Sequence, residues 1–275
     1  MIRITTLVEN SMGEHLGLRS EHGLSFCVET TESMLLFDTG QSDAVIHNAS
    51  QLRIDVSRLD HVVLSHGHYD HSGGLRSIAE HAHHFTLVTG KGFFTEKYAE
   101  RNGSHQFLGN NFDEAYLNDK GIPWSVLENQ VKEIVPGVFV VGNFPRVHSD
   151  EPINPRFKLL SEGAFVPDLF NDEIMLVLDT PKGLVALLGC SHPGMRNMLE
   201  TVKKAFSKPV YALLGGTHLV ESASEGMQAS LAYLHETIKG PIGVSHCTGK
   251  AAMGVLAVSE GRYFTNSTGT SLFID

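Results

Sequence analysis

The sequence predicts an α/β protein in which two packed β-sheets are flanked by helices. Three observations lead to this fold class. Short apolar runs rich in β-branched residues recur along the chain, helical stretches are interleaved with them, and the 275 residues are 41% hydrophobic and 19% charged. Such a composition is typical of a soluble globular protein. Strand-rich halves with interleaved helices favour packed layers, and we expect one domain spanning residues 1–275.

The first part of the chain begins as a meander of strands. Apolar runs at 2–8, 24–29 and 34–37 are separated by turns that contain Gly and Ser, which predicts three strands. A helix is expected at about 42–50, followed by a buried strand at 59–64 that leads directly into a polar loop. The next helix begins near residue 73 and places Leu75, Ile78 and Ala79 on one face. The pattern then returns to a strand at 85–88.

The character of the chain changes between about residues 92 and 172. Asn, Gly and Pro become frequent, and apolar runs are interrupted by Asn110-Asn111, Gly121-Ile122-Pro123 and Asn154-Pro155. This composition predicts an insertion, which is long enough to fold over a neighbouring site as a lid. Within it, the run from Val131 to Val141 is expected to form a hairpin that turns at Pro136-Gly137.

Regular alternation resumes after the insertion. Strands are expected at 174–179, 184–188 and 210–214, with a helix at about 195–206 before the last of them. A final helix at about 224–239 precedes strands near 242–245 and 262–265.

Charge and cysteine content limit the classes of partner. The chain has 31 Asp and Glu against 21 Lys and Arg, a net charge of −10, which would repel a phosphate backbone and argues against a nucleic-acid binder. Its apolar runs are far shorter than the ~20 residues that span a bilayer, so no membrane partner is expected. Three cysteines are too few for a disulfide framework, and the first eight residues resemble a strand rather than a signal peptide. These features predict a cytoplasmic protein and leave its oligomeric state open.

The most informative segment is the polar loop after the strand at 59–64, with the sequence His66-Gly67-His68-Tyr69-Asp70-His71. Side chains at positions i and i+2 of an extended loop point the same way, so His66 and His68 can bind one ion, and Gly67 avoids crowding between them. Asp70 and His71 then face a neighbouring position. Imidazole and carboxylate groups are zinc ligands, and three protein ligands leave a position for water or substrate. The loop therefore predicts a catalytic metal site.

This H-x-H-x-D-H signature, followed by Gly73-Gly74, resembles the metallo-β-lactamase superfamily. The resemblance implies a four-layer αββα sandwich, the metallo-β-lactamase fold, with metals at one edge of the sheets. It also implies one or two divalent ions, with zinc expected first and iron, manganese or magnesium as alternatives. Further ligands should lie at the ends of later strands, and the implied sets are His66, His68 and His192 for one metal and Asp70, His71 and His246 for the second. Asp38 matches the superfamily's upstream aspartate, which orients the histidine loop.

The chain departs from the superfamily's pattern at one position. Most members with two metals place a bridging aspartate at the end of the strand before the last helix, where this chain has Leu214-Gly215-Gly216-Thr217-His218. Because that segment contains no carboxylate, His218 is a candidate as a metal ligand or a proton shuttle, and the alternative is a structural histidine. The candidate catalytic residues are Asp70 and His218.

Further segments, among them Glu21-His22-Gly23-Leu24-Ser25 and Gly189-Cys190-Ser191-His192-Pro193-Gly194, resemble the archaeal and bacterial 7,8-dihydropterin-6-methyl-4-(β-D-ribofuranosyl)aminobenzene-5′-phosphate synthases. The resemblance implies that an aromatic ring attacks the methylene of a dihydropterin diphosphate and displaces pyrophosphate. The substrate would then be a small phosphorylated molecule, with His22 and Arg146 as candidate contacts.

Two other functions stay open at this point. A metallohydrolase of a phosphoester or a lactone would use the same ions, because a metal-bound water is a nucleophile near neutral pH. A redox or metal-responsive binding protein is the alternative from another class, because Cys190 and Cys247 each stand within two residues of an expected ligand.

Overall fold

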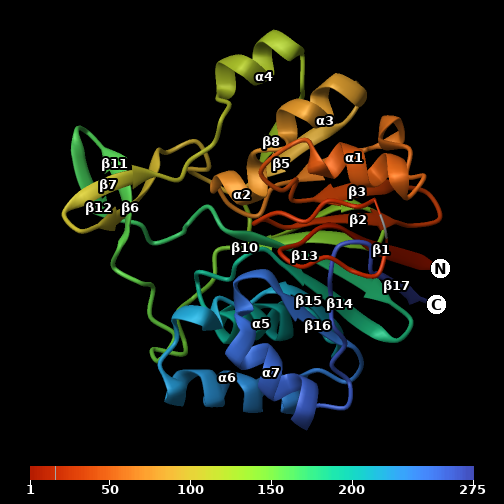
Figure 1. The fold of residues 1–275 in the computed structure, drawn as a ribbon, viewed down its shortest axis with the longest axis vertical. Helices are drawn as coiled ribbons and strands as arrows, with labels where there is room; N and C mark the ends of the chain where they lie inside the picture. Colours follow the sequence, from red (N-terminus) through yellow and green to blue (C-terminus); the bar gives the residue numbers. More distant parts are fainter. Residues whose placement is uncertain (16) are drawn as a thin grey trace.

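The structure is a computed structural model that describes residues 1–15 and 17–275. Its first sheet has seven strands in the order β17-β1-β2-β3-β4-β5-β8 (Figure 1). The bounds are β1 Ile2–Val8, β2 Ser25–Glu29, β3 Met34–Phe37, β4 His61–Val63, β5 Thr86–Thr89, β8 Trp124–Val126 and β17 Ser271–Ile274. Strands β3, β4, β5 and β8 run parallel, so the residues that follow them emerge at one edge. Asp38 and the histidine loop are therefore neighbours.

The second sheet has six strands in the order β16-β15-β14-β13-β10-β9. Their bounds are β9 Val131–Val135, β10 Val138–Gly142, β13 Ile174–Thr180, β14 Gly183–Leu188, β15 Val210–Gly216 and β16 Ile242–Ser245. Strands β14, β15 and β16 are parallel to one another. Parallel pairing brings the residues after them, including His192, His218 and His246, to the same edge of this sheet.

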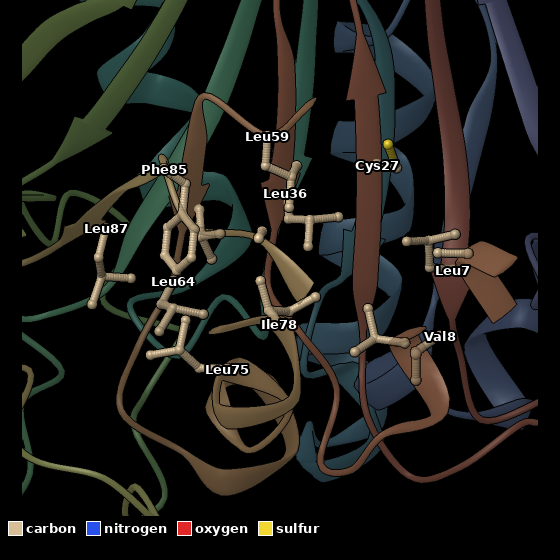
Figure 2. Close-up of a cluster of buried hydrophobic side chains, with 14 of the residues drawn as sticks. Leu7, Val8, Cys27, Leu36, Leu59, Leu64, Leu75, Ile78, Phe85 and Leu87 are labelled. Carbon is tan, nitrogen blue, oxygen red and sulfur yellow. The ribbon is translucent and has the colours of Figure 1, made fainter. Parts of the chain in front are cut away.

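Three hydrophobic clusters show how the layers pack. The first, which includes Leu36, Leu64 and Ile78, lies between the first sheet and helices α1 (Ala44–Gln51) and α3 (Leu75–His81) (Figure 2). A second cluster joins the facing sides of the two sheets, with Phe26 and Leu187 among its members.

The third cluster packs helices α5 (Met195–Ala205), α6 (Ser224–Thr237) and α7 (Lys250–Ser259) against the outer side of the second sheet. The chain thus folds as two packed sheets with helices on both outer faces, and Figure 1 shows the two groups of helices on opposite sides. Successive side chains of β2 point to opposite faces of the first sheet. Phe26 and Val28 therefore belong to the second cluster, and Cys27 belongs to the first.

The segment at about 92–172, expected to be one insertion, is divided in the structure. Strand β8 joins the first sheet, and the hairpin β9–β10, which forms within the predicted run from Val131 to Val141, joins the second sheet. Helix α4 (Glu114–Lys120) and a four-stranded sheet in the order β12-β11-β6-β7 lie outside the main sheets (Figure 1). Its strands are β6 Lys97–Arg101, β7 Ser104–Phe107, β11 Phe157–Ser161 and β12 Ala164–Pro167. Frequent turn residues in this segment obscured β8 and the strands of the outer sheet, whereas the hairpin at 131–141 was predicted.

The C-terminal part also differs from the expectation. Residues 250–259 form helix α7, and the last strand is β17 rather than a strand near 262–265, where Tyr263 makes an isolated bridge to Ile242. Gly254 and two valines lower the intrinsic helix propensity of this segment. Tertiary packing stabilises the helix, because Ala252 and Leu256 are buried in it. Among the helices of residues 1–15 and 17–275, none is long and apolar enough to cross a membrane.

Candidate metal centre

Three histidines converge where the edges of the two sheets meet. One ring nitrogen from each of His66, His68 and His192 lies within 4.8 Å of the other two, and all three residues are buried. Their Nε2 atoms are buried and find no hydrogen-bond partner within the described part of the chain. A buried polar atom without a partner is unfavourable, and three that face one another fit the donor set of a divalent metal ion.

A second group lies beside the first. Oδ2 of Asp70 is 3.6 Å from Nε2 of His71 and 3.4 Å from Nε2 of His246. His22, which is partly exposed, places its Nε2 3.2 Å from the same carboxylate oxygen. Asp70 and His71 belong to the short helix α2 (Tyr69–Ser72), whereas His246 begins the 3-10 turn η3 (His246–Thr248). The chain thus brings together the six residues expected from the sequence, and adds His22 at their rim.

Asp38 fixes the orientation of the histidine loop. Its Oδ2 is 2.6 Å from Nδ1 of His71, and its two carboxylate oxygens accept hydrogen bonds from the backbone N–H and the hydroxyl of Ser65. The Ser65 hydroxyl is in turn 2.9 Å from Nδ1 of His66. Because the Nδ1 atoms of both histidines are engaged in this way, their Nε2 atoms are directed toward the centre.

Several residues of the site have left-handed backbone conformations. The φ angles are +61° at Asp38, +64° at Ser191, +53° at His218 and +55° at His246. Non-glycine residues adopt this region at a cost of about 1–3 kcal/mol each. Each of these residues lies shortly after a strand, so the surrounding contacts hold the chain in sharp bends that turn the side chains toward one another.

Burial determines the protonation of the first histidine group. It lowers the pKa of His66, His68 and His192 well below the usual value, and neighbouring cationic groups lower it further. The three imidazoles are therefore neutral at neutral pH, which is the form that binds a metal. His71 is different: burial opposes its charge, but the carboxylates of Asp38 and Asp70 outweigh that effect and raise its pKa to about 9.

A buried ion pair that the sequence did not reveal supports the histidine loop. Nζ of Lys97 donates to Asp168 at 2.7 Å and to Asp172 at 2.9 Å, and all three side chains are almost fully buried. The other oxygen of Asp172 accepts a hydrogen bond from the N–H of Gly67. A Cβ at Gly67 would lie 2.5 Å from the carbonyl oxygen of Phe93, so the loop passes too close for a larger residue. No local pattern marks Lys97, because its partners are more than 70 residues away.

Glu173 performs a similar role for the loop after β14. Its carboxylate accepts hydrogen bonds from the backbone N–H groups of Ser191 and His192 at 2.5 and 2.9 Å. Burial raises its pKa to about 8, although those two hydrogen bonds act in the opposite direction. Phe170 stacks on the ring of His192 with 3.8 Å between centroids. These contacts leave His192 little freedom to rotate.

His218 lies beside the first histidine group. Its ring centroid is 4.3 Å from that of His192, and its Nδ1 is 3.6 Å from a carboxylate oxygen of Glu221. Burial lowers its pKa to about 4, so the imidazole is neutral at neutral pH. A neutral imidazole can accept a proton from a bound molecule or bind a metal.

Two adjoining cavities open beside the centre. One, of about 270 Å³, is lined by His68, Asp70, His246 and the arginines Arg101 and Arg156. The other, of about 570 Å³, is lined by apolar residues such as Ile153 and Leu219 together with acidic residues such as Asp150 and Glu225. His192, His218 and Glu221 line both. Their volumes are in or near the range of small-molecule sites.

Arg146, a candidate substrate contact from the sequence, is bound to backbone carbonyls in the structure. Its guanidinium donates to the backbone carbonyl oxygens of Pro193 and Leu169, at 2.7 and 2.9 Å, and it belongs to neither cavity lining. Arg146 therefore holds the loop after β14 in place. The arginines that face the centre are Arg156, which extends over the ring of Phe157, and Arg101 at the end of β6.

Comparison with known proteins assigns the class. Residues 20–143 match the family model of the metallo-beta-lactamase superfamily. A curated relative from Methanocaldococcus jannaschii is 31% identical over 264 residues, covering 90% of this chain and 88% of the relative. The chain therefore belongs to the metallo-β-lactamase superfamily, and its α/β fold is that of the superfamily.

Particular members of the superfamily are similar to this chain along most of its length. The relative from Methanocaldococcus jannaschii is named 7,8-dihydropterin-6-methyl-4-(beta-D-ribofuranosyl)-aminobenzene-5′-phosphate synthase. A crystal structure of Tm1679, named a metal-dependent hydrolase of the beta-lactamase superfamily, matches over 100% of both chains with a TM-score of 0.88 and 28% identity. Zinc-bound PqqB from Methylobacterium extorquens shares the fold, with a TM-score of 0.59 and 13% identity over 99% of this chain and 100% of the other.

Proposed function

We propose that the protein is a metal-dependent transferase that joins a dihydropterin methyl group, supplied as its diphosphate, to a ribosylaminobenzene phosphate. The observation that carries this proposal is the pair of cavities that share His192, His218 and Glu221. A donor whose ring and diphosphate bind in two adjoining spaces places its reacting methylene carbon where the spaces meet, which orients it for attack. The 31% identity to a synthase named for this product supports the choice of substrates.

In this proposal the two groups of side chains hold two divalent ions. His66, His68 and His192 bind one, and Asp70, His71 and His246 bind the second. We expect zinc, because imidazole and carboxylate donors suit it, with iron, manganese or magnesium as alternatives. Such ions polarise a phosphoryl oxygen and neutralise the charge of a departing pyrophosphate.

The arginines of the smaller cavity provide the first contacts with substrate. Arg101 and Arg156 carry positive charge into the cavity that also contains Asp70 and His246. Arg156 is held by Glu221, whose carboxylate oxygen lies 2.5 Å from its Nη2, and by the ring of Phe157. Guanidinium groups bind phosphoryl oxygens through charge-assisted hydrogen bonds, so the diphosphate is proposed to lie here. His22, at the rim beside Asp70, is the further contact.

The larger cavity suits the pterin ring better than a phosphate. Its lining combines apolar side chains, such as Ile153 and Leu219, which can pack on the ring, with Glu225, which can accept hydrogen bonds from the amino and ring N–H groups of a pterin. The carboxylates of Asp150 and Glu151 are paired with Arg196. The methylene carbon would then lie near His192 and His218, between the ring in one cavity and the diphosphate in the other.

The transfer step requires a group that accepts a proton from the acceptor molecule. We place the attack at the amine nitrogen of the acceptor rather than at its aromatic ring, because the nitrogen lone pair is the more nucleophilic. The nitrogen forms a bond to the methylene carbon while the bond from that carbon to the diphosphate oxygen breaks. Pyrophosphate leaves, and the nitrogen loses a proton. His218 is proposed to accept it, because its imidazole is neutral and lines both cavities. Asp70 is the second candidate catalytic residue, as a ligand whose carboxylate also faces the smaller cavity.

Hydrolysis is the second candidate function. It is favoured by the similarity to Tm1679, which is named a metal-dependent hydrolase. Water would then take the place of the acceptor, and a phosphoester or lactone would be the substrate. A cytoplasmic location is proposed for either reaction, because Cys27, Cys190 and Cys247 are free thiols, as expected in a reducing compartment.

Mass spectrometry of the products tests the proposal. Metal-loaded protein is incubated with the dihydropterin methyl diphosphate, with and without the ribosylaminobenzene phosphate. Coupled product that requires acceptor and disappears in His66→Ala supports transfer. A hydrolysed dihydropterin in both reactions favours hydrolysis, and metal binding without turnover of either substrate favours the metal-responsive binding protein.

A further inference from the structure

The sulfur of Cys190 lies between the two groups of metal-binding side chains. It falls within 4.8 Å of ring nitrogens of His66 and His71, and also of ring nitrogens of His192 and His218. A third group within the same distance combines it with His246 and Cys247. Cys190 is 4% exposed, and its Sγ is 3.2 Å from Nε2 of His71. The thiol therefore faces the side chains of both proposed metal positions.

The end of β15, where the superfamily's bridging aspartate would be expected, leaves no room for a side chain at Gly216. A Cβ built on Gly216, at the end of β15, would lie 2.5 Å from Sγ of Cys247 and 2.4 Å from the carbonyl oxygen of Gly189. A side chain at this position would therefore require its surroundings to move. The polypeptide thus excludes a carboxylate from Gly216, with the thiol of Cys247 and the backbone of Cys190 beside that position.

The two thiols differ in what they contact. Sγ of Cys247 accepts a hydrogen bond from the N–H of His218 at 3.3 Å and donates to the carbonyl oxygen of Cys190 at 3.4 Å. Sγ of Cys190 faces imidazoles, and Nε2 of His192 in the same region is buried without a hydrogen-bond partner in the described residues. The local contacts therefore hold Cys247 on the backbone and direct Cys190 into the centre.

We propose that Cys190 supplies a thiolate ligand to the metal centre, in place of the carboxylate that Gly216 cannot carry. The inference rests on the proposal that the centre binds divalent metal. Binding forms a bond between sulfur and metal and releases the thiol proton to water. A thiolate favours zinc or iron over magnesium, because soft ligands select these ions, so Cys190 also narrows the choice of metal.

Cobalt(II) titration of the metal-free full chain tests the inference. Visible absorption reports cobalt in the centre, and a near-ultraviolet charge-transfer band reports a bond to sulfur. We expect both signals in the wild type, in Cys247→Ser and in Cys27→Ala, whose thiol is in the core beneath the first sheet. Cys190→Ser should keep the visible bands, lose the sulfur band and bind cobalt at least about tenfold more weakly, the smallest loss typical of residues that only orient a ligand.

Three results would overturn the inference. A sulfur band that persists in Cys190→Ser, or that is lost in Cys247→Ser, would assign the bond to another sulfur. Visible bands without a sulfur band in the wild type would support a metal centre that has no thiolate ligand. The absence of all cobalt bands contradicts the metal centre itself. If Cys190→Ser does not fold, alkylation of the wild type with a thiol reagent tests the assignment. Bound zinc should protect Cys190 from the reagent, and equal labelling of Cys190 with and without zinc would contradict the assignment.

Discussion

Asp38 and His71 are joined by a 2.6 Å contact between Oδ2 and Nδ1, and both residues are fully buried. The contact links the end of β3 to the helix α2 and holds the imidazole with its Nε2 toward Asp70. It also connects, through Ser65, to His66 in the other histidine group. One carboxylate therefore orients side chains at both proposed metal positions.

Replacing Asp38 should weaken metal binding without removing a ligand. In Asp38→Asn the carboxylate charge is lost while the shape is kept, and we expect zinc affinity to fall about ten- to a hundredfold. Competition with a chromophoric chelator measures the change. Asp43→Asn, at an exposed position before α1, is the matched control. Unchanged affinity in Asp38→Asn would show that the contact does not tune the centre.

Removing a proposed metal ligand should abolish metal binding at one of the two proposed positions. His68→Ala deletes one of the three converging nitrogens, and we expect metal content and activity to be lost together. Elemental analysis after dialysis measures the metal. His84→Ala, at an exposed position after α3, should retain full content. Full metal content in His68→Ala would remove His68 from the set of ligands.

The Lys97 ion pair predicts a large effect on stability. Lys97→Met leaves Asp168 and Asp172 buried without their cation, so the free energy of unfolding should fall by about 3–5 kcal/mol. Urea denaturation of the full chain measures it, with the exposed Lys91→Met as control. A change below about 1 kcal/mol in Lys97→Met would mean that the pair is not needed to hold the loop at Gly67.

Stability of the metal-free protein should fall as pH rises from about 7.5 to 9. His71 has a folded-state pKa raised to about 9, and Glu173 one raised to about 8, so the folded chain binds protons that the unfolded chain has released. The buried histidines are neutral in the folded protein, and above about pH 7.5 their imidazoles are largely neutral in the unfolded chain as well, because the usual pKa of histidine is about 6.5. We expect a loss on the order of a few kcal/mol in urea denaturation. A smaller slope in Glu173→Gln would support the assignment, whereas stability that rises with pH in the wild type contradicts it.

Arg101 provides a test of the phosphate contact. Its removal in Arg101→Ala deletes a charge-assisted interaction at the smaller cavity, and the KM for the diphosphate should rise about tenfold or more. Steady-state kinetics measures the change, with Arg58→Ala, exposed in the 3-10 turn η1 (Val56–Arg58), as control. An unchanged KM would place the diphosphate elsewhere.

The sequence predicted the parts of the site that follow strands in a local pattern. His66, His68, Asp70 and His71 stand within six positions, and the packing of the two sheets brings them beside His192. Lys97 and Glu173 could not be predicted, because their roles come from contacts between distant segments. Arg146 was assigned from its charge alone, and its guanidinium binds backbone carbonyls instead.

The elements of the fold that were predicted are likewise those with a clear local sequence pattern. Strands with strong apolar character, such as β13 and β14, were predicted almost to their ends, because both faces are buried. Strand β8 was missed within the polar segment, since three half-buried residues give no clear alternation. Helix α7 was missed because packing on the second sheet, and not local propensity, stabilises it.

Pyrophosphate release with and without the ribosylaminobenzene phosphate tests the central claim most directly, because it separates transfer from hydrolysis in a single assay. The account predicts release from the dihydropterin methyl diphosphate that depends on the acceptor, requires divalent metal and is lost in His66→Ala. Release at the same rate without acceptor, or undiminished in metal-free protein, would contradict a metal-dependent transferase.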